Sequence, residues 1–213
     1  MENFITFFDW DNTLFPSTYE ESLVKDNYVI DVHIEKNNDV HIDIPNEFNS
    51  LENSIKKLVG EAKRYGKVYL LTNGSIEWIN YCFTTYLKNL DKNELFDDII
   101  SARDLYSNEF RSIKMWKFMS LASFLEKNHV RDILFISDMP YDFESFEAVK
   151  MCYESVNFKY IKFSEMMSIQ EIVDTHNKLK DNLFMMIFMT DTCLFRLLKS
   201  FWYIFSLFRK SYF

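Results

Sequence analysis

The chain begins with a run of apolar residues that ends abruptly in two acidic ones. Phe4 to Phe8 reads Phe-Ile-Thr-Phe-Phe, and Asp9 and Asp11 follow with only Trp10 between them. Such a short apolar run is typical of a strand buried on both faces of a parallel sheet. Unpaired carboxylates are costly to bury, and open α/β sheets bind ligands beyond the carboxyl ends of their strands. We therefore expect a catalytic or metal-binding pair at one edge of a parallel sheet, although the same residues also suit an ordinary turn.

The rest of the first 182 residues alternates short apolar runs with stretches of helical periodicity. Strands are expected at 68–71, around 99–100, at 133–136 and at 158–163. Helices are expected between them, beginning near Pro45, Ser75, Ser112 and Pro140, and again from Met166 onward. Strands that alternate with helices are typical of a doubly wound, mainly parallel α/β sheet of the Rossmann-like class. We expect residues 1–182 to form one such core.

Residues 28–44 carry a different signal, because apolar and polar residues alternate on both sides of a polar stretch at 36–39. This pattern predicts a β-hairpin. Placing both apolar sets on one face requires paired residue numbers with an even sum, and hence a loop of three or five residues. His33 and His41 would lie on the polar face, which we expect to be solvated, with a metal site as the alternative. The hairpin and one helix account for 14–71, so we expect a small flap beside the site and no large cap domain.

Composition excludes some classes of function. The net charge of −8 argues against a protein that binds nucleic acid by neutralising phosphates. Cys82, Cys152 and Cys193 lack metal-ligand spacing and fit free thiols in a reducing compartment. The first apolar run is too short for a signal peptide and has no basic region before it, so we expect a cytoplasmic protein.

Two later apolar runs also end in polar residues. The run 68–71 leads into Thr72-Asn73-Gly74, and the run 133–136 leads into Ser137 and Asp138, with Asp142 four residues further on. Together with Asp9-x-Asp11-x-Thr13, these segments resemble, in order, the motifs of the haloacid dehalogenase superfamily of phosphatases. The resemblance covers residues 4 to 142, and Ser137 stands where that family usually has glycine.

The resemblance implies a capless, Mg²⁺-dependent phosphomonoester hydrolase. Asp9 would be the nucleophile that forms an aspartyl-phosphate, and Asp11 would act first as general acid and then as general base. The implied ligands of Mg²⁺ are hard oxygen donors from Asp9, Asp138, Asp142 and the backbone carbonyl of Asp11. The implied phosphate-binding groups are Thr72, Asn73 and a lysine, and Thr13 would support the aspartate loop.

Two lysines compete for the phosphate-binding role. Lys114 and Lys117 are three residues apart and share a helix face. We favour Lys117, because Trp116-Lys117 lies in an apolar run that would fix the lysine stem. A solvated surface role is the alternative for each of them.

Two other functions stay open at this point. A phosphotransferase would pass the phosphoryl group to an acceptor other than water, and a catalytically silent binding or scaffold protein would retain only the fold. For the favoured function the substrate is expected to be a phosphorylated protein or a phosphorylated small molecule.

The composition changes at residue 183. Residues 183–213 are mostly aromatic and aliphatic, and after Asp191 every charged residue is basic. The longest uncharged runs have nine residues, too few to cross the ~30 Å hydrocarbon core of a bilayer. We expect a helical tail that packs on the sheet or in a homodimer contact, with peripheral membrane contact as the alternative.

Overall fold

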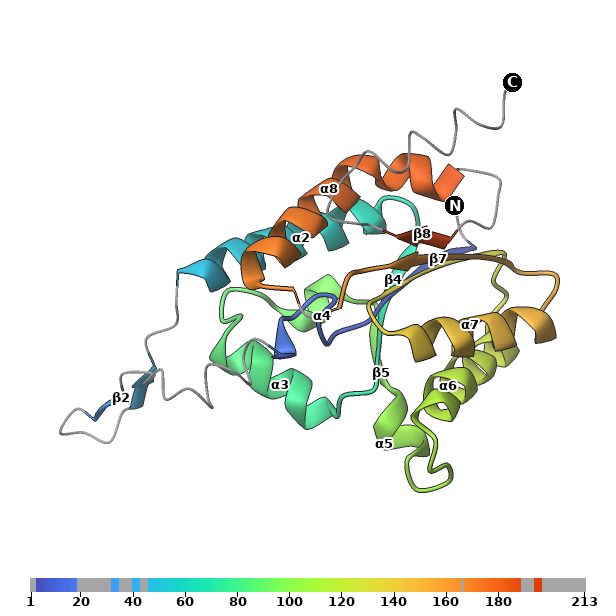
Figure 1. Ribbon diagram of the computed structural model, residues 1–213, viewed down its shortest axis with the longest axis horizontal. Coiled ribbons are helices and arrows are strands. Elements are labelled where there is room, and N and C mark those ends of the chain that lie inside the picture. Colours follow the sequence, from blue (N-terminus) through green and yellow to red (C-terminus); the bar gives the residue numbers. More distant parts are fainter. Residues whose placement is uncertain are drawn as a thin grey trace.

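The computed structural model describes residues 3–18, 32–34, 40–42, 46–165, 167–188 and 194–196. Its core is a six-stranded sheet in which neighbouring strands are parallel (Figure 1). In spatial order the strands are β5 (Asp98–Ser101), β4 (Lys67–Thr72), β1 (Phe4–Phe8), β6 (Asp132–Ser137), β7 (Asn157–Lys162) and β8 (Leu194–Arg196). From β1 the chain builds outward to β4 and β5, then crosses to β6 on the other side of β1. The reversal makes the space beyond the carboxyl ends of β1 and β6 a topological switch point.

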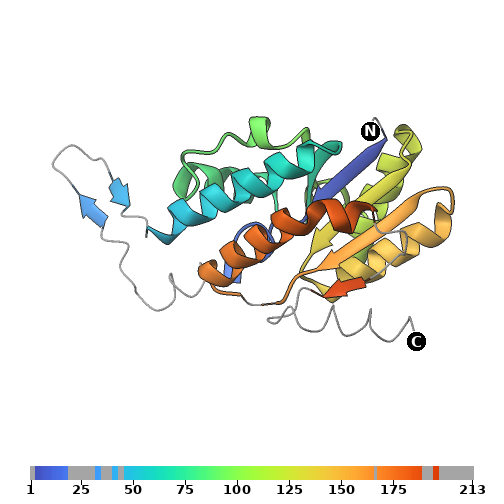
Figure 2. The same cartoon turned by 90° about the horizontal axis from the view of Figure 1, so that it is seen from above.

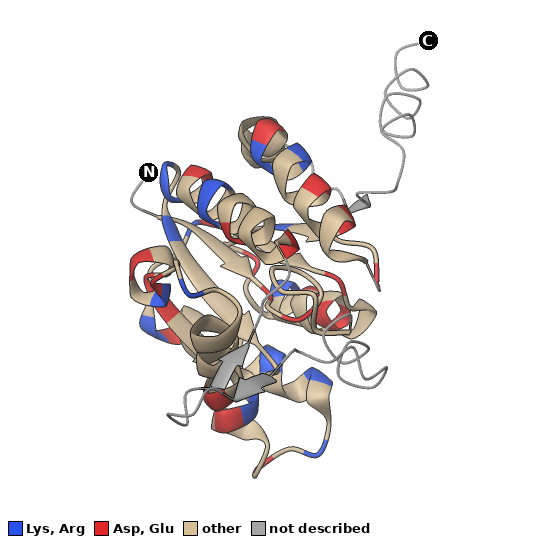
Figure 3. Ribbon diagram, turned by 90° about the vertical axis from the view of Figure 1, so that its left-hand side faces the viewer, with Lys and Arg blue, Asp and Glu red and all other residues tan. Residues whose placement is uncertain are grey.

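Helices cover both faces of this sheet. One hydrophobic cluster joins the sheet to α2 (Glu47–Lys63), α3 (Ile76–Thr85), α4 (Lys92–Leu95) and α8 (Ile169–Phe188). The other joins it to α5 (Ala102–Tyr106), α6 (Ile113–Lys127) and α7 (Pro140–Cys152). Figure 2 shows α2 and α8 side by side across one face. The predicted parallel α/β sheet of the Rossmann-like class is therefore confirmed. Basic and acidic residues are interspersed along the outer helices (Figure 3).

Strand β1 shows why the first apolar run is nearly continuous. Phe4 and Phe8 belong to the cluster on one face, and Ile5 and Phe7 belong to the cluster on the other. All four side chains are buried. A strand covered on both faces needs apolar residues at successive positions, so the expectation that this strand is buried on both faces is confirmed.

Glycine is required where α2 turns into β4. A Cβ atom at Gly66 would lie 2.0 Å from the carbonyl oxygen of Phe4, a distance that no side chain can occupy. Helix α2 ends at Lys63, and the close approach at Gly66 lets the chain enter β4 directly beside β1.

The hairpin has the predicted register. Strands β2 (Val32–Ile34) and β3 (Val40–Ile42) form an antiparallel sheet of their own, in which His33 pairs with His41. The paired residue numbers have an even sum, and five residues separate the strands, as one of the two predicted loop lengths requires. Residues 19–31, 35–39 and 43–45 lie outside the described part of the chain, so the flap beside the site and the missing cap domain stay predictions.

The end of the chain differs from the predicted helical tail at two points. Helix α8 continues past residue 183 to Phe188, and Leu183, Met186 and Ile187 are buried in the hydrophobic core. The expected boundary between core and tail therefore falls inside a core helix. The next described segment is the strand β8, where a helix was expected. It is a strand because its backbone pairs with the edge of β7. None of the described helices combines the length and apolarity needed to cross a membrane.

Candidate active site

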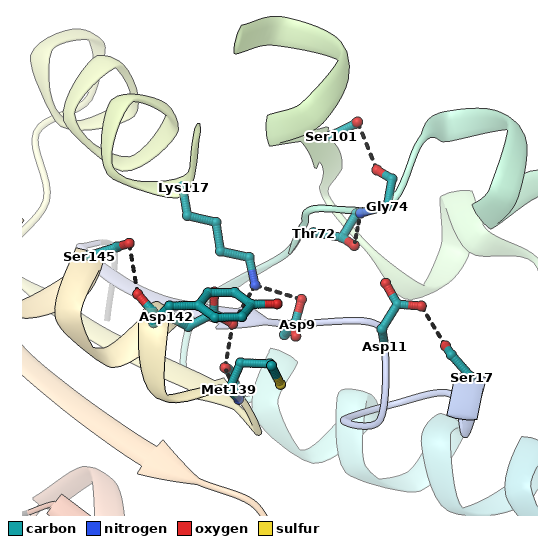
Figure 4. Close-up of polar contacts among 12 residues, drawn as sticks. Asp9, Asp11, Ser17, Thr72, Gly74, Ser101, Lys117, Met139, Asp142 and Ser145 are labelled. Atoms are coloured by element: carbon teal, nitrogen blue, oxygen red, sulfur yellow. Dashed lines mark hydrogen bonds and ion pairs between the residues drawn. The ribbon is translucent and has the colours of Figure 1, made fainter. Parts of the chain in front are cut away.

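The predicted site residues follow three neighbouring strands. Thr72 is the last residue of β4, Asp9 follows β1, and Asp138 follows β6. The backbone N–H of Asp9 donates to the carbonyl oxygen of Ile136 at 2.9 Å, which ties the end of β1 to the end of β6. Parallel neighbours lie about 4.8 Å apart, so the topology gathers these side chains at the switch point. Figure 4 shows Asp9 and Thr72 together with Lys117 and Asp142.

A buried lysine connects two of the carboxylates. The Nζ atom of Lys117, on α6, lies 2.7 Å from Oδ1 of Asp9 and 2.6 Å from Oδ2 of Asp142. The exposed fractions of the three side chains are 1%, 5% and 0%, so water screens these pairs little. Ser137 donates its hydroxyl proton to the same Oδ2 of Asp142 at 2.5 Å. Lys114 lies instead at the surface and pairs with Glu144, so the structure places only the favoured lysine in the site.

The turn after β1 is built by local hydrogen bonds. The backbone N–H groups of Leu14 and Phe15 both donate to the carbonyl oxygen of Trp10 at 2.9 Å. Asn12 has a φ of 54°, a left-handed conformation that asparagine tolerates better than most residues. Trp10 is fully buried and stacks between Phe15 and Phe83, at ring-centroid distances of 5.6 and 5.3 Å. The residue between the two aspartates thus anchors their turn in the core.

Two donors hold the side chain of Asp11, and both act on the same oxygen. The hydroxyl of Ser17 donates to Oδ1, and the indole Nε1–H of Trp78 donates to Oδ1 at 2.9 Å. Trp78 belongs to the first turn of α3, where its backbone N–H donates to the N-cap side chain of Ser75. The predicted general acid is therefore held by residues both near and distant in sequence.

The turn after β4 lies against Asp11. Gly74 donates its N–H to Thr72 Oγ1 at 2.8 Å and accepts from the Ser101 hydroxyl at 2.8 Å. A Cβ atom at Gly74 would lie 3.2 Å from Thr72 Oγ1 and 3.3 Å from Asp11 Oδ2. The amide side chain of Asn73 is buried, and neither of its polar atoms has a partner among the described residues. The turn thus brings a hydroxyl and an unpartnered amide close to the aspartate loop.

Burial and mutual repulsion oppose ionisation of the carboxylates. Burial raises the pKa of Asp9, and the charges of Asp142, Asp138 and Asp11 add to this, while Lys117 acts in the opposite direction. Burial, followed by the charge of Asp142, raises the pKa of Asp138 to about 7. Burial opposes the charge on Lys117, but the carboxylates of Asp142 and Asp9 outweigh it and raise the lysine pKa. Full ionisation of these carboxylates would therefore leave an excess of negative charge, which a further cation would offset.

The donor set fits a divalent cation such as Mg²⁺. Both carboxylate oxygens of Asp138 and Oδ1 of Asp142 are buried without a hydrogen-bond partner in the described structure. Buried charges are normally paired or coordinate metals, and hard oxygen donors suit Mg²⁺. Among the described residues, however, no three acidic, histidine or cysteine side chains are gathered into a ready coordination shell. The chain thus supplies suitable ligands without holding them in the geometry of a closed site.

Thr13 supports the aspartate loop through its backbone. Its carbonyl oxygen accepts a 2.8 Å hydrogen bond from Nε2 of His176 on α8, whereas its buried hydroxyl oxygen has no partner among the described residues. A carbonyl oxygen only accepts, so Nε2 carries the proton and Nδ1 accepts from the hydroxyl of Ser54 at 2.9 Å. Burial lowers the pKa of this imidazole to about 4. The support expected of the Thr13 side chain therefore comes through its carbonyl.

Sequence reasoning missed several residues around the site. Trp78, Ser17 and His176 lie on segments whose local pattern shows only a helix or a turn. Tyr160 donates to Ser137 Oγ and to the carbonyl of Met139, each at 3.2 Å, and thereby supports the turn after β6. Ser137 was the one available sequence signal of these supporting contacts, because it stands where the resembled motif has glycine.

Comparison with known proteins gives no family assignment. No protein-family model matches the chain, and neither the curated proteins nor the solved structures give a significant match.

Proposed function

We propose that this chain is a Mg²⁺-dependent phosphomonoester hydrolase of the haloacid dehalogenase type, with Asp9 as the nucleophile. The observation that carries the proposal is the pairing of Lys117 with Asp9 and Asp142, at 2.7 and 2.6 Å, at the switch point of the sheet. Two turn aspartates of purely structural use would be solvated, whereas Asp9 is only 4% exposed. Burying charged groups is unfavourable without a compensating role, which functional sites commonly supply.

The nucleophilic step belongs to Asp9. One of its carboxylate oxygens attacks phosphorus, and the bond between phosphorus and the leaving oxygen breaks with its electron pair on that oxygen. The ammonium of Lys117, already in contact with Asp9, balances the charge that Asp9 and the phosphoryl group bring together. The hydroxyl of Thr72 and the unpartnered amide of Asn73 would hold phosphoryl oxygens. The product of this step is an aspartyl-phosphate.

Asp11 would handle the protons of both half-reactions. In the first it gives a proton to the leaving oxygen and becomes a carboxylate. In the second it takes a proton from the water that attacks the aspartyl-phosphate. The sum is the conversion of a phosphomonoester and water into an alcohol and inorganic phosphate, with Asp9 and Asp11 restored.

The cation would be held by the side chains of Asp9, Asp138 and Asp142 and by the backbone carbonyl of Asp11. When bound, Mg²⁺ supplies positive charge that offsets the repulsion between a carboxylate and a phosphate dianion. The unpartnered oxygens of Asp138 and Asp142 support this assignment.

Hydrolysis of p-nitrophenyl phosphate tests the proposal. We expect activity with Mg²⁺, loss of activity with EDTA, and a loss of at least about a thousandfold in Asp9→Asn. Asp174→Asn makes the same chemical change at an exposed position of α8 and should retain activity. A phosphoryl group trapped on Asp9 and released by hydroxylamine would identify the intermediate. Equal rates for the wild type and Asp9→Asn would refute the proposal, and transfer to glycerol in preference to water would identify a phosphotransferase.

A further inference from the structure

We propose that Trp78 and Ser17 are positioning residues that select which oxygen of Asp11 transfers the proton. This inference rests on the proposed function, because it concerns the general acid of that reaction. It goes further by assigning the proton to a single atom, Oδ2, and by naming the side chains that impose this choice.

The first step of the argument is the distribution of donors on the carboxyl group. The indole Nε1–H of Trp78 donates to Oδ1, and the hydroxyl of Ser17 is the donor of a second hydrogen bond to the same oxygen. None of the described residues donates a hydrogen bond to Oδ2. An oxygen that accepts two hydrogen bonds has no room for a proton of its own, because that hydrogen would face the hydrogens of its donors. In the acid form of Asp11 the proton therefore belongs on Oδ2.

The second step is the direction in which Oδ2 points. It lies 3.3 Å from the Cβ position of Gly74, and Thr72 Oγ1 lies 3.2 Å from the same position. Oδ2 therefore faces the turn whose hydroxyl and amide would hold the phosphoryl group. A proton on Oδ2 can pass to the leaving oxygen of a phosphoryl group held there, while a proton on Oδ1 would face Ser17 and Trp78.

The third step is the rigidity of the indole. Trp78 meets Phe15 edge to face at 5.9 Å and stacks on Tyr81 at 5.9 Å. Its backbone is fixed by the cap of α3. An aromatic side chain packed on two sides has little rotational freedom, so the N–H direction is set before any substrate binds.

The series of leaving groups is the informative test, because acid assistance matters most when the leaving oxygen is strongly basic. Phenyl phosphate releases a phenol with a pKa of about 10, whereas 2,4-dinitrophenyl phosphate releases a strongly acidic phenol that needs little protonation. We expect Trp78→Phe and Ser17→Ala each to lower kcat/KM for phenyl phosphate by about tenfold. The rate for 2,4-dinitrophenyl phosphate should change by no more than about twofold in the same variants.

Trp116→Phe is the matched control. It also removes an indole N–H, but one that donates to the backbone carbonyl of Phe110 at 2.6 Å. In this variant kcat/KM for phenyl phosphate and for 2,4-dinitrophenyl phosphate should change by the same factor. Equal losses on both substrates in Trp78→Phe and Ser17→Ala, or no loss on either, would overturn the inference and leave the proposed function intact. An absence of Asp9-dependent hydrolysis in the wild-type protein would overturn both.

Discussion

The buried imidazole of His176 should make the stability of this protein respond to pH in a defined direction. Burial lowers its pKa to about 4, whereas a histidine in the unfolded chain has a pKa of about 6.5. Above the unfolded pKa both states hold a neutral ring, and the stabilising effect of the native contacts is complete. As the pH falls through 6.5 toward 4, the unfolded state takes up a proton that the folded state refuses, so the free energy of unfolding falls.

The size of the effect follows from these two values. Each pKa unit corresponds to about 1.4 kcal/mol, so lowering the pH from 7.5 to 5.0 should cost the native state about 2 kcal/mol through His176 alone. The full difference of about two and a half pKa units would be reached only well below pH 4, where the histidine of the folded state is also protonated.

The raw pH profile of the wild type will not isolate this contribution. The pKa of Asp138 is raised to about 7 by burial and by the charge of Asp142. A carboxyl group with a raised pKa binds a proton more readily in the folded state, so acidification stabilises the protein through Asp138. The two groups act over the same pH range with opposite signs.

A variant without the imidazole separates them. His176→Gln can still donate to the carbonyl oxygen of Thr13 but has no group that titrates. Urea unfolding followed by circular dichroism at pH 7.5 and 5.0 gives the free energy of unfolding of both proteins. The difference between variant and wild type should shift by about 2 kcal/mol in favour of the variant on acidification. Parallel pH dependences in the two proteins would refute the argument, because they would mean that His176 titrates alike in both states.

Three further predictions concern the candidate site. Mg²⁺ at a hundredfold excess over its Kd should stabilise the protein by about 2.7 kcal/mol and raise its Tm by about 5–10 °C. If the carboxylate of Asp138 binds the cation, this shift should be absent in Asp138→Asn, and an equal shift in that variant contradicts the assignment. Gly74→Ala should lower phosphatase activity about tenfold, because its Cβ would lie 2.9 Å from Cδ1 of Trp78 and 3.3 Å from Asp11 Oδ2 and would displace one of them. Gly60→Ala, whose new methyl group would meet no described atom within 4 Å outside the backbone of its own helix, should stabilise α2 by about 0.5–1 kcal/mol without loss of activity. Lys117→Met should abolish detectable turnover of p-nitrophenyl phosphate and Lys114→Met, on the same helix, should not; comparable activities would remove the lysine from the mechanism.

Much of the core was predictable because its signals are local. A strand covered on both faces has to be apolar at nearly every position, and Phe4–Phe8 shows this directly. The carboxyl ends of parallel strands meet at one edge, so three polar strand ends predicted one site. Lys117 is favoured over Lys114 in the sequence because the apolar run around it would fix its stem, and in the structure its side chain is 1% exposed.

The missing parts depend on contacts between distant segments. Trp78 meets Asp11 across 67 residues, and His176 meets Thr13 across 163, so no pattern within either segment reveals the pairing. The strand β8 was missed for a related reason. Its three residues, Leu-Phe-Arg, pair with the edge of β7, and a run this short shows neither strand nor helix periodicity.

The carboxylates, the lysine and the two polar turns of the site come from segments that end at residue 142, yet no single segment carries a working set. A nascent chain that has been synthesised only through β4 would carry Asp9, Asp11 and Thr72 but neither Lys117 nor Asp138. Strand β6 pairs with β1 on the side opposite β4, so it must dock against the edge of a strand made more than a hundred residues earlier. The proposed activity would therefore require synthesis of the chain beyond β6, and a product truncated before residue 138 would lack Asp138 and Asp142.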